Sequence, residues 1–216
     1  MVKFSLVSVL SVMLLLSGQL SANEWGVNSN REDAVVALKD GDPATRRKGL
    51  ARLAEIGKND DVPHMLRLLR DDDPAVRGMA HQAIEGLWLR VDNLAARRIF
   101  IDSITKIQNG QWKVAIELLD QVIDLEPTFS EAWNKRGDAW LSLGELDRAL
   151  VDYENALKLN PYHYGVMQSC ASIYMERSDA RNSYAMLTRA MAINPNLEHL
   201  IPTIIDLEKR LDNDQI

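Results

Sequence analysis

Three prolines recur along the second half of the sequence at one fixed spacing. Pro127, Pro161 and Pro195 are 34 residues apart, and each ends a similar phrase: Asp-Leu-Glu-Pro, Lys-Leu-Asn-Pro or Ala-Ile-Asn-Pro. A repeat of this length that ends in proline has room for two antiparallel helices joined by a turn. The period therefore predicts an array of helical hairpins.

The segment 130–163 carries the most complete version of this repeat. Its characteristic residues are Trp133, Arg136, Gly137, Trp140, Ala149, Tyr153, Ala156 and Pro161. This segment resembles the tetratricopeptide repeat, which has Trp, Leu, Gly, Tyr, Ala, Phe, Ala and Pro at these places. Gly137 and Ala149 are expected to be small because two helices cross there. Gly144 is expected to close the first helix in a left-handed conformation. Arg136 departs from the family pattern.

Two further segments, 96–129 and 164–197, match the same pattern in register. Together the three units at 96–197 are followed by an amphipathic stretch, 198–212, which is rich in Leu and Ile on one face. Repeat arrays need a terminal element with a polar outer face, so this stretch is expected to be a capping helix. Its polar residues are mixed in sign, which favours a cap over a helix that lies on a membrane surface.

An independent repeat occupies residues 31–91. The phrase from Leu38 to Arg46 returns 31 residues later, from Leu69 to Arg77, with Asp-Pro at its centre both times. Aspartate before proline is a strong helix start, because the carboxylate caps free N–H groups and proline is tolerated in the first turn. This stretch resembles short HEAT-like repeats, and we expect Arg46 and Arg77 to bond carboxylates or carbonyls between neighbouring repeats. The predicted fold is all-α: a right-handed α-solenoid of helix-turn-helix repeats, HEAT-like and then tetratricopeptide.

The first residues are of a different kind. Lys3 precedes an apolar run from Phe4 to Leu16 and then small and polar residues up to Ala22. This order is typical of a secretory signal peptide, which we place at residues 1–22. The alternative is an uncleaved segment that tethers the protein to a membrane. The predicted location is accordingly exported and periplasmic.

Charge and motifs argue against several classes of function. The formal net charge is −6, which gives no basic face for nucleic acid. The four histidines are scattered, and the sequence has no phosphate loop, nucleophile elbow or Cys/His cluster. We therefore expect no catalytic residue, no metal site and no cofactor. The single cysteine, Cys170, cannot form an internal disulfide and is expected to be buried.

The resemblance to tetratricopeptide repeats implies a binding function. In that family the first helices of successive units line a concave groove that holds a peptide or protein segment. The residues that correspond to the groove are Arg97, Phe100, Ile104, Asn134, Lys135, Asp138, Leu141, Gln168, Ser172 and Met175. Such a mixture suits recognition of a peptide backbone together with one or two apolar anchors.

Three hypotheses about function follow from the sequence. The favoured one is a non-catalytic adaptor or scaffold that binds another protein through the groove. A second is a structural component of an envelope complex that self-assembles into a homo-oligomer. A third is a hydrolase or a protein that binds a small molecule, in which the ligand would raise the melting temperature.

Overall fold

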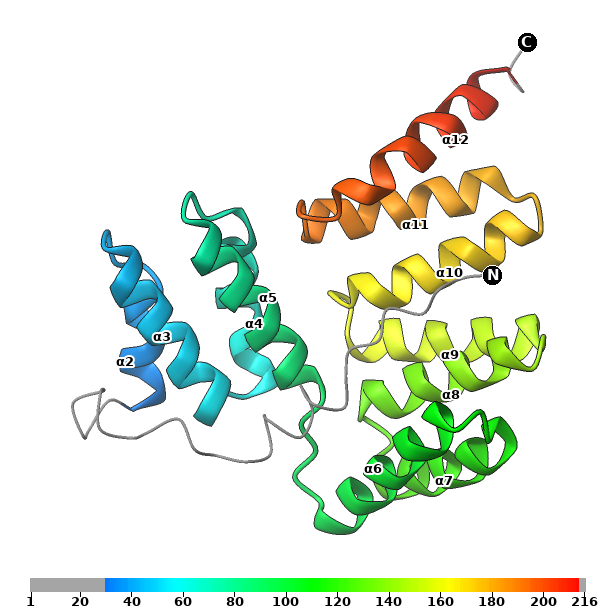
Figure 1. Cartoon of the computed structure of the whole chain (residues 1–216), viewed down its shortest axis with the longest axis horizontal. Coiled ribbons are helices and arrows are strands. Elements are labelled where there is room, and N and C mark those ends of the chain that lie inside the picture. The colour runs from blue at the N-terminus through cyan, green and yellow to red at the C-terminus, as the bar shows by residue number, and fades with distance from the viewer. Residues whose placement is uncertain (1–29, 214–216) are drawn as a thin grey trace. The chain divides into compact units, whose positions relative to one another are not determined.

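The computed structural model describes residues 30–213, and the expected signal peptide at 1–22 lies outside them (Figure 1). Within that range all regular structure is helical, as the repeat pattern predicts. The chain divides into two compact units after Arg90. None of the helices between residues 30 and 213 is long and apolar enough to cross a membrane.

Between residues 30 and 90 the first unit contains four α-helices: α2 (Arg31–Ala37), α3 (Pro43–Ile56), α4 (Val62–Leu66) and α5 (Pro74–Trp88). Short 3-10 turns at Asn59–Asp61 and Arg67–Arg70 flank α4. The core is formed by apolar residues from all four helices and their joints, among them Leu38, Leu50, Leu53, Met65, Leu69, Ile84 and Leu87.

The two long helices of this unit, α3 and α5, begin in the same way. Asp42 accepts hydrogen bonds from the backbone N–H groups of Ala44 and Thr45, at 3.1 and 3.2 Å. Asp73 does the same for the two residues that follow Pro74, at 2.8 and 3.1 Å. These backbone bonds hold the pKa of both aspartates below the ordinary value. The repeated Asp-Pro phrase is therefore a repeated helix cap.

An arginine four residues after each capping aspartate binds backbone carbonyl oxygens. Arg46 donates to the carbonyls of Asp40 and the next residue, at 2.9 and 3.0 Å. Arg77 donates to those of Asp71 and the next residue, at 2.7 and 3.2 Å. Arg46 also donates to the Asp71 carboxylate at 2.7 Å, which joins one repeat to the next. The expectation that these arginines bond between neighbouring repeats is confirmed for Arg46.

The second unit is a stack of helical hairpins (Figure 1). The pairs are α6 (Leu94–Gln108) with α7 (Trp112–Leu125), α8 (Ser130–Ser142) with α9 (Leu146–Leu159), and α10 (Tyr164–Glu176) with α11 (Ala180–Ile193). A 3-10 turn at Glu198–Leu200 leads into α12 (Ile201–Asn213) at the end of the stack.

Each hairpin turns through one residue in the left-handed region. These residues are Gly110, Gly144 and Ser178, with φ of 70°, 78° and 58°, and they are 34 positions apart. The N–H of the following residue bonds back to a carbonyl five residues earlier each time, at 2.8–3.0 Å. Glycine adopts this conformation without strain, whereas serine crowds its Cβ against its own carbonyl. The predicted role of Gly144 is confirmed, and Ser178 shows that the turn forms even where glycine is missing.

Within the second hairpin the helices approach closely at Gly137. A Cβ atom at that position would lie 2.7 Å from Cε1 of Tyr153, so only glycine leaves room for the ring. Tyr153 is fully buried, and its hydroxyl donates a hydrogen bond to Asp138 at 2.9 Å. The small residue at the predicted crossing point therefore admits a large aromatic from the partner helix.

Arg136, which departs from the repeat pattern, has a partner that explains it. Its guanidinium makes two hydrogen bonds to the buried Asp152 on α9, at 2.8 and 2.7 Å, and one to Asp120 on α7, at 2.6 Å. It also lies over the ring of Trp133, 4.8 Å from the centroid. Arg136 thus ties together three helices from two successive hairpins, where the family pattern has leucine packing.

The last helix, α12, covers the end of the array. Leu207 is buried against Ala171 of α10 and Leu187 of α11, with Leu200 and Ile204 packed beside it. Pro202 is the second residue of α12, where its missing N–H costs nothing.

Replacing Ser178 with glycine should stabilise the second unit. The change removes the strain of a left-handed serine, so we expect about 1 kcal/mol of added stability. The midpoint of urea unfolding measures this. Ser178→Ala keeps a Cβ at the same φ and serves as the control; a gain of equal size in that variant would contradict the explanation.

Candidate partner-binding surface

All ten residues predicted to face a groove lie on the first helices of the three hairpins. Arg97, Phe100 and Ile104 are on α6, the next four on α8, and Gln168, Ser172 and Met175 on α10. We call the face formed by these helices the first-helix face. Its residues differ widely in how much they expose to solvent.

Two of the ten are interior residues. Phe100 is 5% exposed and packs edge-to-face against Phe129, with ring centroids 5.0 Å apart. Asn134 is also 5% exposed, and its Nδ2 donates to Glu131 Oε2 at 3.1 Å. Both side chains are occupied inside the protein. The prediction that Phe100 and Asn134 are available to a partner is therefore corrected, because both side chains are buried beneath the first-helix face.

Several others are partly exposed but already bonded. Arg97 donates twice to the carbonyl oxygen of Val91, at 3.0 and 2.7 Å. Lys135 and Asp138 form an ion pair at 3.0 Å. Ile104 and Leu141 are half-buried, and Leu141 packs on the core of the second and third hairpins. The charges of Lys135 and Asp138 on α8 therefore neutralise each other.

The residues on α10 are uncharged. Ser172 donates to the carbonyl of Gln168 at 3.1 Å, and Gln168 donates to that of Tyr164 at 3.4 Å. Both are half-buried. Met175, near the end of the helix, is 40% exposed and is the most accessible apolar member of the predicted set.

Beneath this face lies a buried acid–base pair that the sequence did not reveal. Glu131, at the start of α8, accepts a hydrogen bond from Nε2 of His163, and Nδ1 of His163 accepts one from the Val166 N–H at 3.3 Å. The Glu131 carboxylate and the Val166 N–H thus hold the imidazole ring from both sides. The pair links α8 to the N-terminus of α10, 32 residues further along the chain. Burial by itself raises the pKa of Glu131, but His163, Lys135 and Asn134 outweigh it and hold that pKa at about 2.

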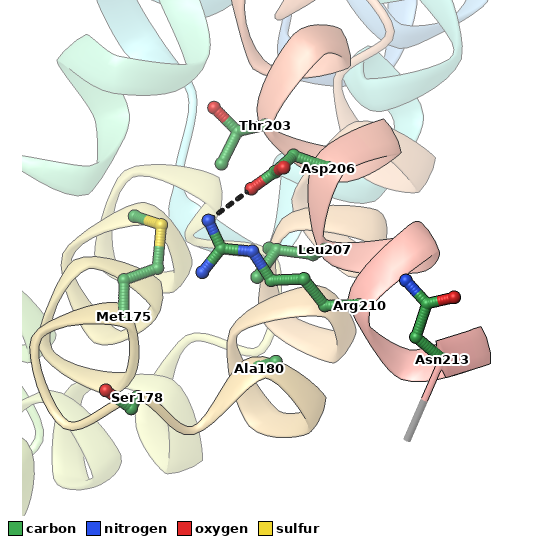
Figure 2. A pocket seen from close by; sticks show the side chains of 8 residues that line it. All are labelled: Met175, Ser178, Ala180, Thr203, Asp206, Leu207, Arg210 and Asn213. Atoms are coloured by element: carbon green, nitrogen blue, oxygen red, sulfur yellow. Dashed lines mark ion pairs between the residues drawn. The ribbon is translucent and has the colours of Figure 1, made fainter. Parts of the chain in front are cut away.

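A pocket opens where α10 meets α12, with a volume of about 510 Å³ (Figure 2). Met175, Ser178 and Ala180 line one side of it. The other side is formed by residues of α12: Thr203, Asp206, Leu207, Arg210 and Asn213. Figure 2 shows Arg210 reaching across the pocket, with its ion pair to Asp206, at 2.6 Å, dashed.

Met175 is the one pocket residue that the sequence predicts to bind a partner, because the stretch that forms α12 is predicted to be a capping helix. A signal for Asp206 is present in the repeat period. Asp206 is 34 positions after Ser172 and 68 after Asp138. The helix α12 therefore continues the row of first helices and contributes polar residues to the same face.

The remaining groups of chemical interest are the cysteine and the side chains that could bind a metal ion. Cys170 is buried and not in a disulfide, and burial raises the pKa of its thiol to about 12. A thiol that stays protonated is a poor nucleophile. Among residues 30–213 no three His, Cys, Asp or Glu side chains are grouped so that they could hold a metal ion.

Comparison with known proteins gives the repeat its family. Residues 130–163 match the model of the tetratricopeptide repeat, over the same bounds as the predicted middle unit. The chain contains a tetratricopeptide repeat. It is 20% identical over 190 residues to a TPR repeat-containing protein of Rhizobium etli, which covers 88% of this chain and 87% of that protein.

Two other similarities are more partial or more distant. Anaphase-promoting complex subunit 3 of Schizosaccharomyces pombe is 26% identical over 90 residues, which is 42% of this chain and 14% of the subunit. A crystal structure of MamA is similar with a TM-score of 0.46 and 18% identity, over 80% of this chain and 99% of that one.

The buried Glu131 makes the free energy of unfolding depend on pH in the acid range. Its pKa is lower in the folded protein than the ordinary 4.5, so its stabilising effect is present above about pH 4.5 and is lost as the pH falls toward 2. For Glu131→Gln we expect a lower free energy of unfolding at neutral pH. We also expect that free energy to fall less steeply between pH 4.5 and pH 2 than in the wild type. Urea unfolding at a series of pH values measures both. Glu117→Gln, on the exposed side of α7, should leave the pH dependence unchanged.

Proposed function

We propose that this protein is a non-catalytic adaptor that holds a segment of another protein on its first-helix face, along α8, α10 and α12. The tetratricopeptide repeat at 130–163 is a module that generally mediates contacts between proteins. The proposal extends this general property to one surface of this chain.

The observation that carries the proposal is a row of polar residues at the repeat period. Asp138, Ser172 and Asp206 occupy equivalent positions of three successive first helices, and none of the three is buried. The pocket with Met175 lies beside the end of this row. Polar side chains that repeat along a face, next to an apolar hollow, suit a peptide whose backbone is bonded repeatedly and whose side chain is anchored once.

The binding experiment uses peptides selected from a random display library on the immobilised protein. Ser172→Arg places a long charged side chain in the middle of the row, so we expect selected peptides to bind at least about tenfold more weakly, a loss of about 1.4 kcal/mol. Ala185→Arg makes the same kind of change on the exposed side of α11 and should leave binding intact. Fluorescence anisotropy gives both dissociation constants. Equal affinities in the two variants would place the binding surface elsewhere.

One feature favours the alternative of a self-assembling structural component. Ile201 and Ile205 on α12 are 41% and 45% exposed. The residues 34 positions earlier, Met167 and Ala171, are buried. If this outer face mediates self-association, sedimentation equilibrium will show oligomers that Ile205→Glu dissociates and Ser172→Arg does not.

We further propose that the adaptor works in the periplasm, on the support of the signal-like segment at residues 1–22. N-terminal sequencing of the protein from its native cell envelope tests this. A start at Asn23 is the expected result, because the apolar run is then removed at Ala22. A start near Met1 in the membrane fraction would indicate the uncleaved tether, and recovery from the cytoplasm would contradict export.

A further inference from the structure

The pocket between α10 and α12 combines an apolar floor with a compensated ion pair. Leu207 is buried, and Met175 and Ala180 lie beside it on the α10–α11 side. Arg210 reaches over this floor and is paired with Asp206 four residues earlier on the same helix (Figure 2). Methionine adapts its shape to the side chain it contacts, so the floor suits one medium-sized apolar group.

Charge compensation recurs at both ends of the row formed by Asp138, Ser172 and Asp206. Asp138 is neutralised by Lys135 on α8, and Asp206 by Arg210 on α12. Between them α10 presents Gln168 and Ser172, which carry no charge. Asp138 and Asp206 are each paired with a cation, so a partner segment that lies along this row meets no excess of charge of either sign from these residues.

We infer that the pocket anchors an apolar side chain from an internal, uncharged stretch of a partner protein, and that it disfavours a C-terminal carboxylate. This inference rests on the proposed adaptor function and names the chemistry of the segment that is held. A peptide segment is neutral and offers both kinds of group: its C=O groups can accept from the Arg210 guanidinium, and its N–H groups can donate to the Asp206 carboxylate.

Asp206 is the group that sets this preference. A guanidinium binds a carboxylate well through two parallel hydrogen bonds, and Arg210 by itself would attract a chain end. Asp206 already takes one nitrogen of that guanidinium at 2.6 Å and repels a second carboxylate. Removing the charge of Asp206 should therefore convert an amide site into a carboxylate site.

Two small probes that differ only at this group test the inference: N-acetyl-leucine methylamide and N-acetyl-leucine, the free acid. The full-length protein is labelled with carbon-13 at its methionine methyl groups, and Met175→Leu identifies the Met175 signal. In the wild type we expect the methylamide to shift the Met175 signal and the acid to shift it less at equal concentration. The signal of Met65, which is buried in the first unit, serves as an internal reference.

In Asp206→Asn the acid should bind about fivefold more tightly than in the wild type, which corresponds to the upper range for an exposed ion pair. The affinity of the same variant for the methylamide should change by less than about twofold. Asp212→Asn, also exposed on α12 but not part of the pocket, makes the same change of charge and should alter neither probe.

Each other outcome overturns a defined part of the inference. A Met175 signal that neither probe moves means that the pocket anchors no leucine-like side chain. If the acid binds the wild type as well as the methylamide does, the preference for an internal segment is wrong. If Asp206→Asn leaves the acid unchanged, Asp206 does not set the preference. The Ser172→Arg experiment reports on the adaptor function separately, because it uses selected peptides and a residue outside the pocket.

Discussion

The close approach of two helices within each hairpin is the constraint on which the second unit depends. At Gly137 the partner helix inserts the Tyr153 ring where any Cβ would collide, and at Ala171 the backbone carbonyl accepts a hydrogen bond from Ser183 at 3.1 Å. Helices that lie this close bury their apolar stripes against each other and leave their other faces to the neighbouring hairpin. The first helices can then form one row, and the surface proposed to bind a partner consists of that row.

Much of this arrangement could be predicted from sequence, because it depends on residues whose backbone or size is special. The prolines set the period, Gly110 and Gly144 mark the turns, and the Asp-Pro phrases mark the starts of α3 and α5. Such features act locally, so a single sequence shows them. Position within the repeat also placed all ten predicted binding residues on first helices.

The sequence could not show which of those side chains are consumed inside the protein. Phe100 meets Phe129 from a helix start 29 residues away, and Asn134 joins a cluster with Glu131 and His163 that spans two hairpins. These contacts depend on side-chain directions at distant positions, which periodicity does not specify. Arg136 is a second example, since its departure from the repeat pattern is explained only by its bonds to Asp152 and Asp120.

The two walls of the pocket are held with unequal strength. On one side, α10 is buried against α9 and α11 and is joined to α8 through His163. On the other, α12 contains a single buried residue, Leu207, and few apolar contacts mean a low free energy of local opening. The α10 wall of the pocket is therefore held more firmly than the α12 wall, which can move more easily. The width of the pocket could then adapt to an apolar side chain of the proposed kind, and such a side chain would also reduce the local opening of α12 at the end of the repeat array.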